Sequence, residues 1–116
     1  MAKYVNVLGT KYEIQRVTAD EIVEGYGGFC DPDLHTIKVI RLETSVEWKE
    51  ESAEKRKARE KLILRHEIVH AFLNESGLED NCAIPQFSWA KNEEMVDWIA
   101  VQGPKIFEAW QKAGAM

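Results

Sequence analysis

Three residues near the middle of the chain have types and spacing that suit metal-dependent hydrolysis. His66, Glu67 and His70 form the pattern HExxH. In an α-helix, residues at positions i and i+4 lie about 40° apart around the axis and one turn along it, so the two imidazoles converge on one point. Imidazole nitrogens hold zinc at about 2.0–2.1 Å, and Glu67, about 100° from His66, is near enough to contact a metal-bound water. The pattern therefore predicts a site for one Zn²⁺ ion, with Glu67 as general base.

Two histidines leave such a site incomplete, because catalytic zinc usually has three protein ligands and a water. Glu93 and Asp97 lie four residues apart at the start of a later predicted helix. We expect Glu93 to be the third ligand and Asp97 to accept a hydrogen bond from the far nitrogen of a ligating histidine. If the pair stood alone, the simpler explanation would be that acidic residues in a first turn complement the helix dipole. Glu94 is the runner-up for the third ligand, and His35 and Cys82 are weaker candidates.

The first third of the chain predicts two β-hairpins beside the site. Residues 5–14 contain a two-residue loop at 9–10 that begins with glycine, as a type II′ turn prefers. Residues 29–41 contain a strong turn signal at 31–33, followed by a β-branched run. Because Lys38 interrupts that run, we expect its strand to be partly solvated or at an edge of the sheet.

The second half of the chain predicts helices. Residues 47–61 are dense in Glu, Lys and Arg, which is typical of a solvated helix face. Residues 62–73 continue the same helix and are apolar in nearly every direction, so we expect the HExxH segment to be buried. A further helix over 93–102 is expected to stop before Pro104, which would open a last helix.

Together these elements predict an α+β fold, with residues 1–116 as a single domain in which a small twisted sheet packs on the buried HExxH helix. The chain has 15 basic and 20 acidic side chains and a formal net charge of −5, which argues against a generic nucleic-acid binder. No apolar stretch is long enough to span a membrane, and no signal peptide is recognisable. The two cysteines lack CxxC spacing, so we expect a cytoplasmic protein with free thiols.

Two segments resemble motifs of known zinc peptidases. Residues 66–73 read HEIVHAFL and residues 93–100 read EEMVDWIA. The chain is similar to gluzincin-type metallopeptidases, and more closely to the small ImmA/IrrE-like enzymes of phages and mobile elements. In those enzymes the third ligand opens a stretch like E-x-x-A-[ND]-x-F-A; here Val96 stands for the alanine and Ile99 for the phenylalanine. The SprT-like family is a weaker match, because this chain lacks its cysteine ribbon and basic surfaces.

The resemblance implies a minimal zincin-like architecture in which His66, His70 and Glu93 bind zinc and Glu67 acts as general base. It also implies a protein or peptide substrate, with a repressor or another regulatory protein as one candidate. We expect the substrate to add as an extended strand beside residues 37–41. The alternative is a catalytically weak, zinc-bound module that binds a regulatory protein, because no Tyr or His follows the second motif to stabilise an oxyanion. Trp89 is a lesser candidate for a residue that lines the cleft.

Overall fold

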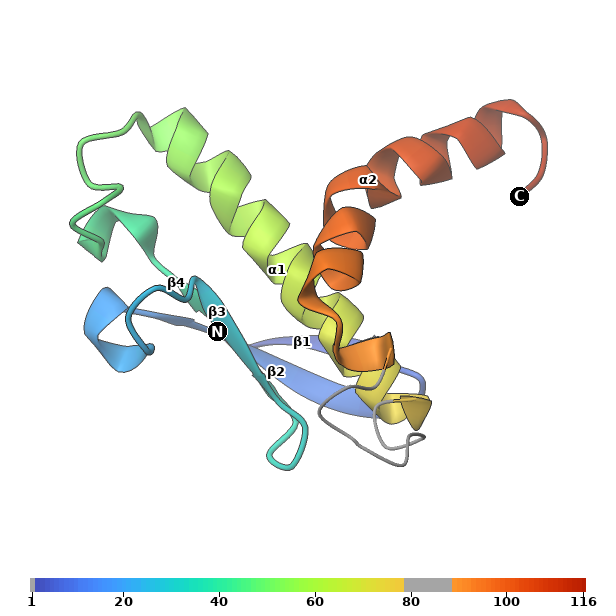
Figure 1. Ribbon diagram of the computed structural model, residues 1–116, viewed down its shortest axis with the longest axis horizontal. Helices are drawn as coiled ribbons and strands as arrows, with labels where there is room; N and C mark the ends of the chain where they lie inside the picture. Colours follow the sequence, from blue (N-terminus) through green and yellow to red (C-terminus); the bar gives the residue numbers. More distant parts are fainter. Residues whose placement is uncertain (1, 79–88) are drawn as a thin grey trace.

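The computed structural model describes residues 2–78 and 89–116 (Figure 1). Four strands form one mixed sheet in the order β1-β2-β4-β3, and helix α1 crosses one face of this sheet while α2 packs on α1. The described part of the chain therefore has the predicted α+β class. The strands are β1 (Lys3–Val7), β2 (Thr10–Val17), β3 (Gly28–Asp31) and β4 (Thr36–Ile40); the helices are α1 (Ala53–Glu75) and α2 (Glu93–Lys112).

The first hairpin turns one residue earlier than predicted. Its loop is Leu8-Gly9, with φ values of +51° and +92°, and strand pairing begins at Val7 and Thr10. Two positive φ values are the signature of a type I′ turn, which matches the right-handed twist of the flanking strands. The amide of Gly9 also donates to Oδ1 of Asn6 at 2.8 Å, which stabilises the turn in this position.

The second hairpin, β3–β4, forms as predicted, and β4 is the partly solvated strand that was expected rather than an edge strand. β4 pairs in parallel with β2 on one side and antiparallel with β3 on the other, so it is an interior strand. Ile37 and Val39 are buried against α1, whereas Lys38 alternates to the other face of the sheet. The charge of Lys38 thus marks the more solvated face of the sheet, and the edge strands are β1 and β3.

The core lies between the sheet and α1. Val7, Tyr12, Ile37 and Val39 from the strands pack with Ala71 of the helix, all at 3% exposure or less. The prediction that the HExxH helix is buried all round is wrong, because apart from Ala71 its apolar residues are at most half-buried. The sheet and α2 cover only part of its circumference.

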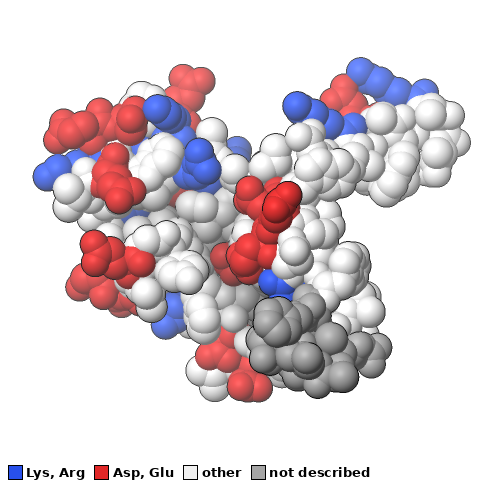
Figure 2. Space-filling model, viewed as in Figure 1, with Lys and Arg blue, Asp and Glu red and all other residues white. Residues whose placement is uncertain are grey.

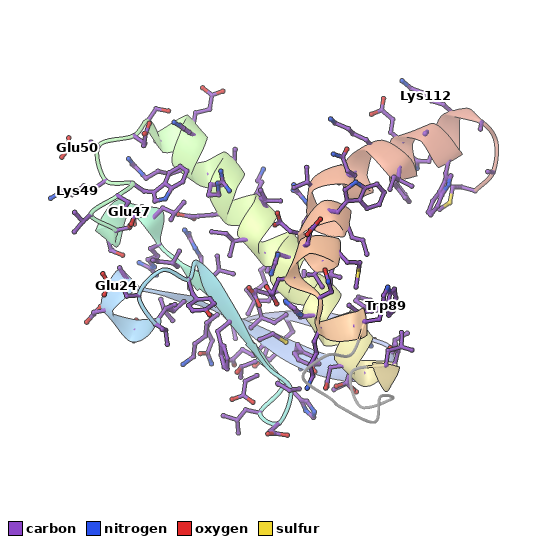
Figure 3. All side chains as sticks on the ribbon, in the orientation of Figure 1. Glu24, Glu47, Lys49, Glu50, Trp89 and Lys112 are labelled. Carbon is purple, nitrogen blue, oxygen red and sulfur yellow. The ribbon has the colours of Figure 1, made fainter. Side chains whose placement is uncertain are left out.

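Helix α1 begins later than predicted. Its first residue is Ala53 rather than one near residue 47, because Ser52 caps the helix by accepting the amide of Lys55 at 3.1 Å. The acidic and basic residues before Ser52 lie in turns, among them Glu47, Lys49 and Glu50, whose side chains extend into solvent (Figure 3).

Two carboxylates of α1 bind groups that belong to the sheet side of the fold. Glu60 forms an ion pair with Arg16 and accepts the amide of Leu42 at 2.9 Å. Glu75 accepts hydrogen bonds from Thr10 Oγ1 and from the hydroxyl of the buried Tyr12, both at 2.7 Å. These two hydrogen bonds hold the pKa of Glu75 below its usual value.

Helix α2 continues through Pro104, so the predicted break there is wrong. Proline has no amide hydrogen and leaves the carbonyl of Ala100 without its helical partner. The side chain of Arg65 in α1 compensates, because its Nε donates to this carbonyl at 2.8 Å. Figure 1 shows the helix bent near its middle, with its C-terminal half projecting from the body of the protein.

This arrangement predicts that the contribution of Arg65 depends on Pro104. Replacing Arg65 by Met should lower the free energy of unfolding by about 1–3 kcal/mol, because it leaves a carbonyl unsatisfied. In a Pro104→Ala background the new amide can pair with Ala100, so the same replacement should cost less. Urea unfolding of the two single variants and the double variant measures this coupling, and purely additive losses would contradict the assignment.

The surface carries mixed charge. On the face shown in Figure 2, acidic and basic side chains are interspersed and no continuous basic patch is visible. In the part of the chain that the structure describes, neither helix combines the length and apolarity needed to cross a bilayer.

Candidate metal centre

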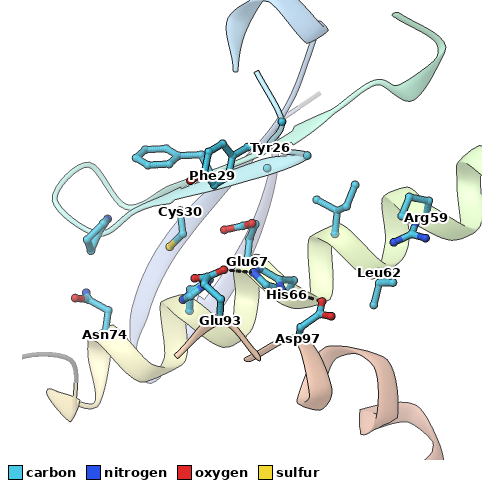
Figure 4. Close-up of a pocket in the computed structure, with 16 residues that line it drawn as sticks. Tyr26, Phe29, Cys30, Arg59, Leu62, His66, Glu67, Asn74, Glu93 and Asp97 are labelled. Atoms are coloured by element: carbon cyan, nitrogen blue, oxygen red, sulfur yellow. Dashed lines mark hydrogen bonds and ion pairs between the residues drawn. The ribbon is translucent and has the colours of Figure 1, made fainter. Parts of the chain in front are cut away.

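The structure brings the HExxH residues of α1 next to the first turn of α2 (Figure 4). Asn92 caps α2 by accepting the amide of Met95 at 2.7 Å, which places Glu93 in the first turn. One carboxylate oxygen of Glu93 lies 3.1 Å from Nε2 of His66, and the other lies 2.7 Å from Nε2 of His70. One ligand atom from each of the three residues therefore lies within 4.8 Å of the other two.

This group could hold a metal ion. Four ligands at about 2.0–2.1 Å in tetrahedral geometry lie about 3.4 Å from one another, and the three candidate ligand atoms lie within 4.8 Å of one another. Two histidines and a glutamate are also a known donor set of catalytic zinc, which leaves the fourth position for water. The side chains of His66 and His70 are 18% and 16% exposed, and that of Glu93 is 68% exposed, so the group opens to solvent on the side of α2.

Asp97 lies one turn after Glu93 and faces the other nitrogen of His66. Its Oδ1 is 3.4 Å from Nδ1 of His66, whereas Nε2 of the same ring points to Glu93. A carboxylate in this position favours the tautomer that carries hydrogen on Nδ1 and leaves Nε2 free to bind a metal.

Burial favours the neutral form of His70. Its pKa is lowered from the usual 6.5, mainly because the ring is buried, although the charge of Glu93 opposes the shift. The neutral imidazole is the form that binds a metal, so burial disfavours the competing proton.

Glu67 is the buried acidic residue of the site, with 7% of its surface exposed. It extends from α1 toward β3 (Figure 4). Burial raises its pKa from 4.5 to about 7; the nearby His66 opposes the rise, and the negative charge of Glu93 adds to it. A carboxyl group with a pKa in this range can take up and return a proton near neutral pH.

Two glycines allow β3 to approach α1 at this point. A Cβ atom on Gly28 would lie 2.9 Å from the carbonyl oxygen of Lys38 and 3.0 Å from Cγ of Glu67. A Cβ atom on Gly27 would meet Cδ1 of Ile63 at 2.7 Å, which is the flexible end of a side chain. The absence of a side chain at Gly28 thus leaves room for Glu67.

We expect Gly28→Ala to destabilise the protein by about 1–3 kcal/mol, because the added methyl group meets backbone and cannot be accommodated by a side-chain rotation. It should also displace Glu67. Gly27→Ala is the matched control and should cost less, since Ile63 can change its rotamer. Urea unfolding of the two variants compares these costs, and equal losses would argue against a special role for Gly28.

A cavity of about 420 Å³ lies beside the three candidate ligands, between α1, β3 and the first turn of α2. Its walls include Tyr26 and Phe29, which are 66% and 54% exposed, and also Arg59 and Asn74 (Figure 4). None of these four residues was predicted from the sequence to line the site. Arg59 had a detectable signal, because it lies seven residues before His66 on the same helical face. Tyr26 had no such signal, because its place at the cavity depends on how the chain before β3 is folded, which spacing along the sequence does not show.

The other sequence candidates lie elsewhere. Glu94 is exposed and is not among the residues that line the cavity. His35 follows β3, and its ring packs on Tyr12 with a centroid separation of 5.3 Å. Trp89 is 60% exposed and lies at the base of α2 without lining the cavity (Figure 3). Cys82 falls outside the described residues.

Comparison of the chain with models of known protein families, with curated proteins and with solved structures finds no match.

Proposed function

We propose that this protein is a zinc-dependent endopeptidase with a minimal zincin-like architecture. The observation that carries the proposal is the convergence of His66, His70 and Glu93 beside the buried carboxyl group of Glu67, at the wall of an open cavity. The resemblance of the two motifs to ImmA/IrrE-like enzymes supports the same reaction and suggests a regulatory protein, such as a repressor, as substrate.

The reaction is the hydrolysis of a peptide bond. Bound zinc supplies a Lewis acid that lowers the pKa of water and polarises a carbonyl group. Glu67 takes a proton from the attacking water as its oxygen bonds to the carbonyl carbon, and returns this proton to the amine as the carbon–nitrogen bond breaks. Asp97 holds the ring of His66 in the ligating tautomer. Tyr26 and Arg59 line the cavity and carry hydrogen-bond donors, which makes them the candidates for stabilising a developing oxyanion.

The substrate strand expected beside residues 37–41 is reassigned, because β4 is an interior strand. β3 is paired on one side only within the described sheet, and its residues 28–30 line the cavity. An extended peptide could add to the free edge of β3 through backbone hydrogen bonds, with its scissile bond near Glu67.

Metal analysis followed by a cleavage assay tests the proposal. We expect the purified protein to hold about one zinc ion per chain. Cleavage of unfolded casein or of the products of neighbouring genes should stop with a chelator and return with added zinc. Bound zinc without cleavage of any substrate would favour the alternative, a zinc-bound module that binds a regulatory protein. A protein that binds no metal would contradict both functions.

A further inference from the structure

A second concave surface, the basic groove, lies between the sheet and the other side of α1. Its volume is about 530 Å³. Its floor is apolar and comprises Ile14, Val39 and Leu64, of which Val39 is 3% exposed. Five basic residues surround this floor: Lys3, Arg16, Arg41, Lys57 and Lys61.

The sheet register and the helical period together produce this groove. Lys3 pairs with Ile14, and Arg16 pairs with Val39, so the basic and apolar side chains share the face of the sheet that α1 covers. On α1, the spacing of Lys57, Lys61 and Leu64 is i, i+4 and i+7, which places them on one stripe. This stripe lies roughly opposite the face that carries the two site histidines.

The charge of the basic groove is opposite to that of the whole protein. It holds five of the 15 basic residues of a chain whose net charge is −5. The single acidic residue that lines it is Glu60, whose side chain is only 13% exposed and already binds Arg16 and the amide of Leu42. Lys57, Lys61 and Arg41 are exposed, so their positive charges face an incoming ligand.

We propose that the basic groove binds an acidic peptide segment of a partner protein, which places an apolar side chain on the floor and carboxylates against the basic residues. An apolar floor with a basic rim complements a ligand that carries both features. A nucleic acid fits less well, because no aromatic residue for base stacking lines the groove among the described residues. The groove and the metal centre lie on different faces of α1, so this inference does not depend on peptidase activity.

Fluorescence anisotropy with a labelled peptide tests the inference. The probe is a peptide of about twelve residues in which Glu and Leu alternate, and its matched form carries Gln in place of Glu. We expect the protein to bind the Glu peptide, with affinity that falls as salt rises, and to bind the Gln peptide at least about tenfold more weakly. Equal binding of the two peptides, or no binding of either at low salt, would overturn the inference.

Charge reversal locates the binding surface. Lys57→Glu/Lys61→Glu should weaken binding of the Glu peptide at least about tenfold, and the milder Lys57→Gln/Lys61→Gln should weaken it less. Lys105→Glu/Lys112→Glu is the matched control, because it changes net charge equally at exposed positions in the C-terminal half of α2. Unchanged binding after reversal at Lys57 and Lys61, with circular dichroism showing a folded protein, would refute the location. Tighter binding of a thymidine oligonucleotide, sensitive to the same reversal, would assign the groove to nucleic acid instead.

Discussion

Replacing Glu67 by Gln is expected to abolish peptide hydrolysis and to leave the zinc content unchanged. Gln has nearly the same size and fits the same buried position, but its amide cannot take a proton from water. The loss of a general base typically lowers the rate on the order of 10²–10⁴-fold. Initial cleavage rates, together with the zinc content of the wild-type and variant proteins, measure both parts of the prediction.

Glu94→Gln is the matched control for this experiment. It removes the same charge from an exposed residue that does not line the cavity. We expect it to retain both zinc and activity. If Glu67→Gln cleaved as fast as Glu94→Gln, Glu67 could not be the general base, whatever the zinc content of the two proteins.

Replacing His70 by Ala is expected to remove zinc and the stability that zinc provides. Nε2 of His70 lies 2.7 Å from Glu93, so its loss deprives the site of one of three converging ligands. We expect the affinity for zinc to fall more than about 100-fold. Zinc at about 100 times its Kd should raise the free energy of unfolding of the wild-type protein by about 2.7 kcal/mol, and this gain should vanish in the variant. Thermal unfolding with and without zinc measures the difference.

His35→Ala provides the control, because it removes the third histidine of the chain, which packs on Tyr12 outside the site. It should keep its zinc-dependent gain in stability even if its unfolding temperature changes. Glu93→Gln and Glu94→Gln form a second pair, in which only the first should lose zinc. A zinc-dependent gain that survives in His70→Ala would refute the assignment of the ligand.

The grouping of the candidate site was predictable because it depends on short-range spacing. His66 and His70 lie one helical turn apart in any helix, and the same holds for Glu93 and Asp97. When two such pairs lie on successive helices, a single contact between the helices is enough to bring all four residues together. The additional residues of the cavity wall, Tyr26 above all, depend on how the chain enters β3 and could not be predicted from spacing.

The sheet order was not predictable, because it depends on contacts between distant strands. Lys38 within an apolar run fits an edge strand as well as an interior strand with one solvated face, and only the pairing of β4 with β2 distinguishes these cases. The continuity of α2 through Pro104 has a similar cause, because the side chain that satisfies Ala100 belongs to another helix. Local propensity contains no information about either contact.

The two carboxylates that bind the sheet side of the fold have a consequence for the geometry of the candidate metal site. Glu60 and Glu75 lie fifteen residues apart on α1, about 22 Å along its axis, and the HExxH segment lies between them. A helix with mostly half-buried apolar residues could roll about its long axis at little cost. Hydrogen bonds to Glu60 and Glu75, at two distant points on α1, oppose such a rotation. The angular setting of the two imidazoles is thus maintained by polar anchors remote from the candidate metal site, and loosening either anchor would misalign the candidate ligands while leaving their identities intact.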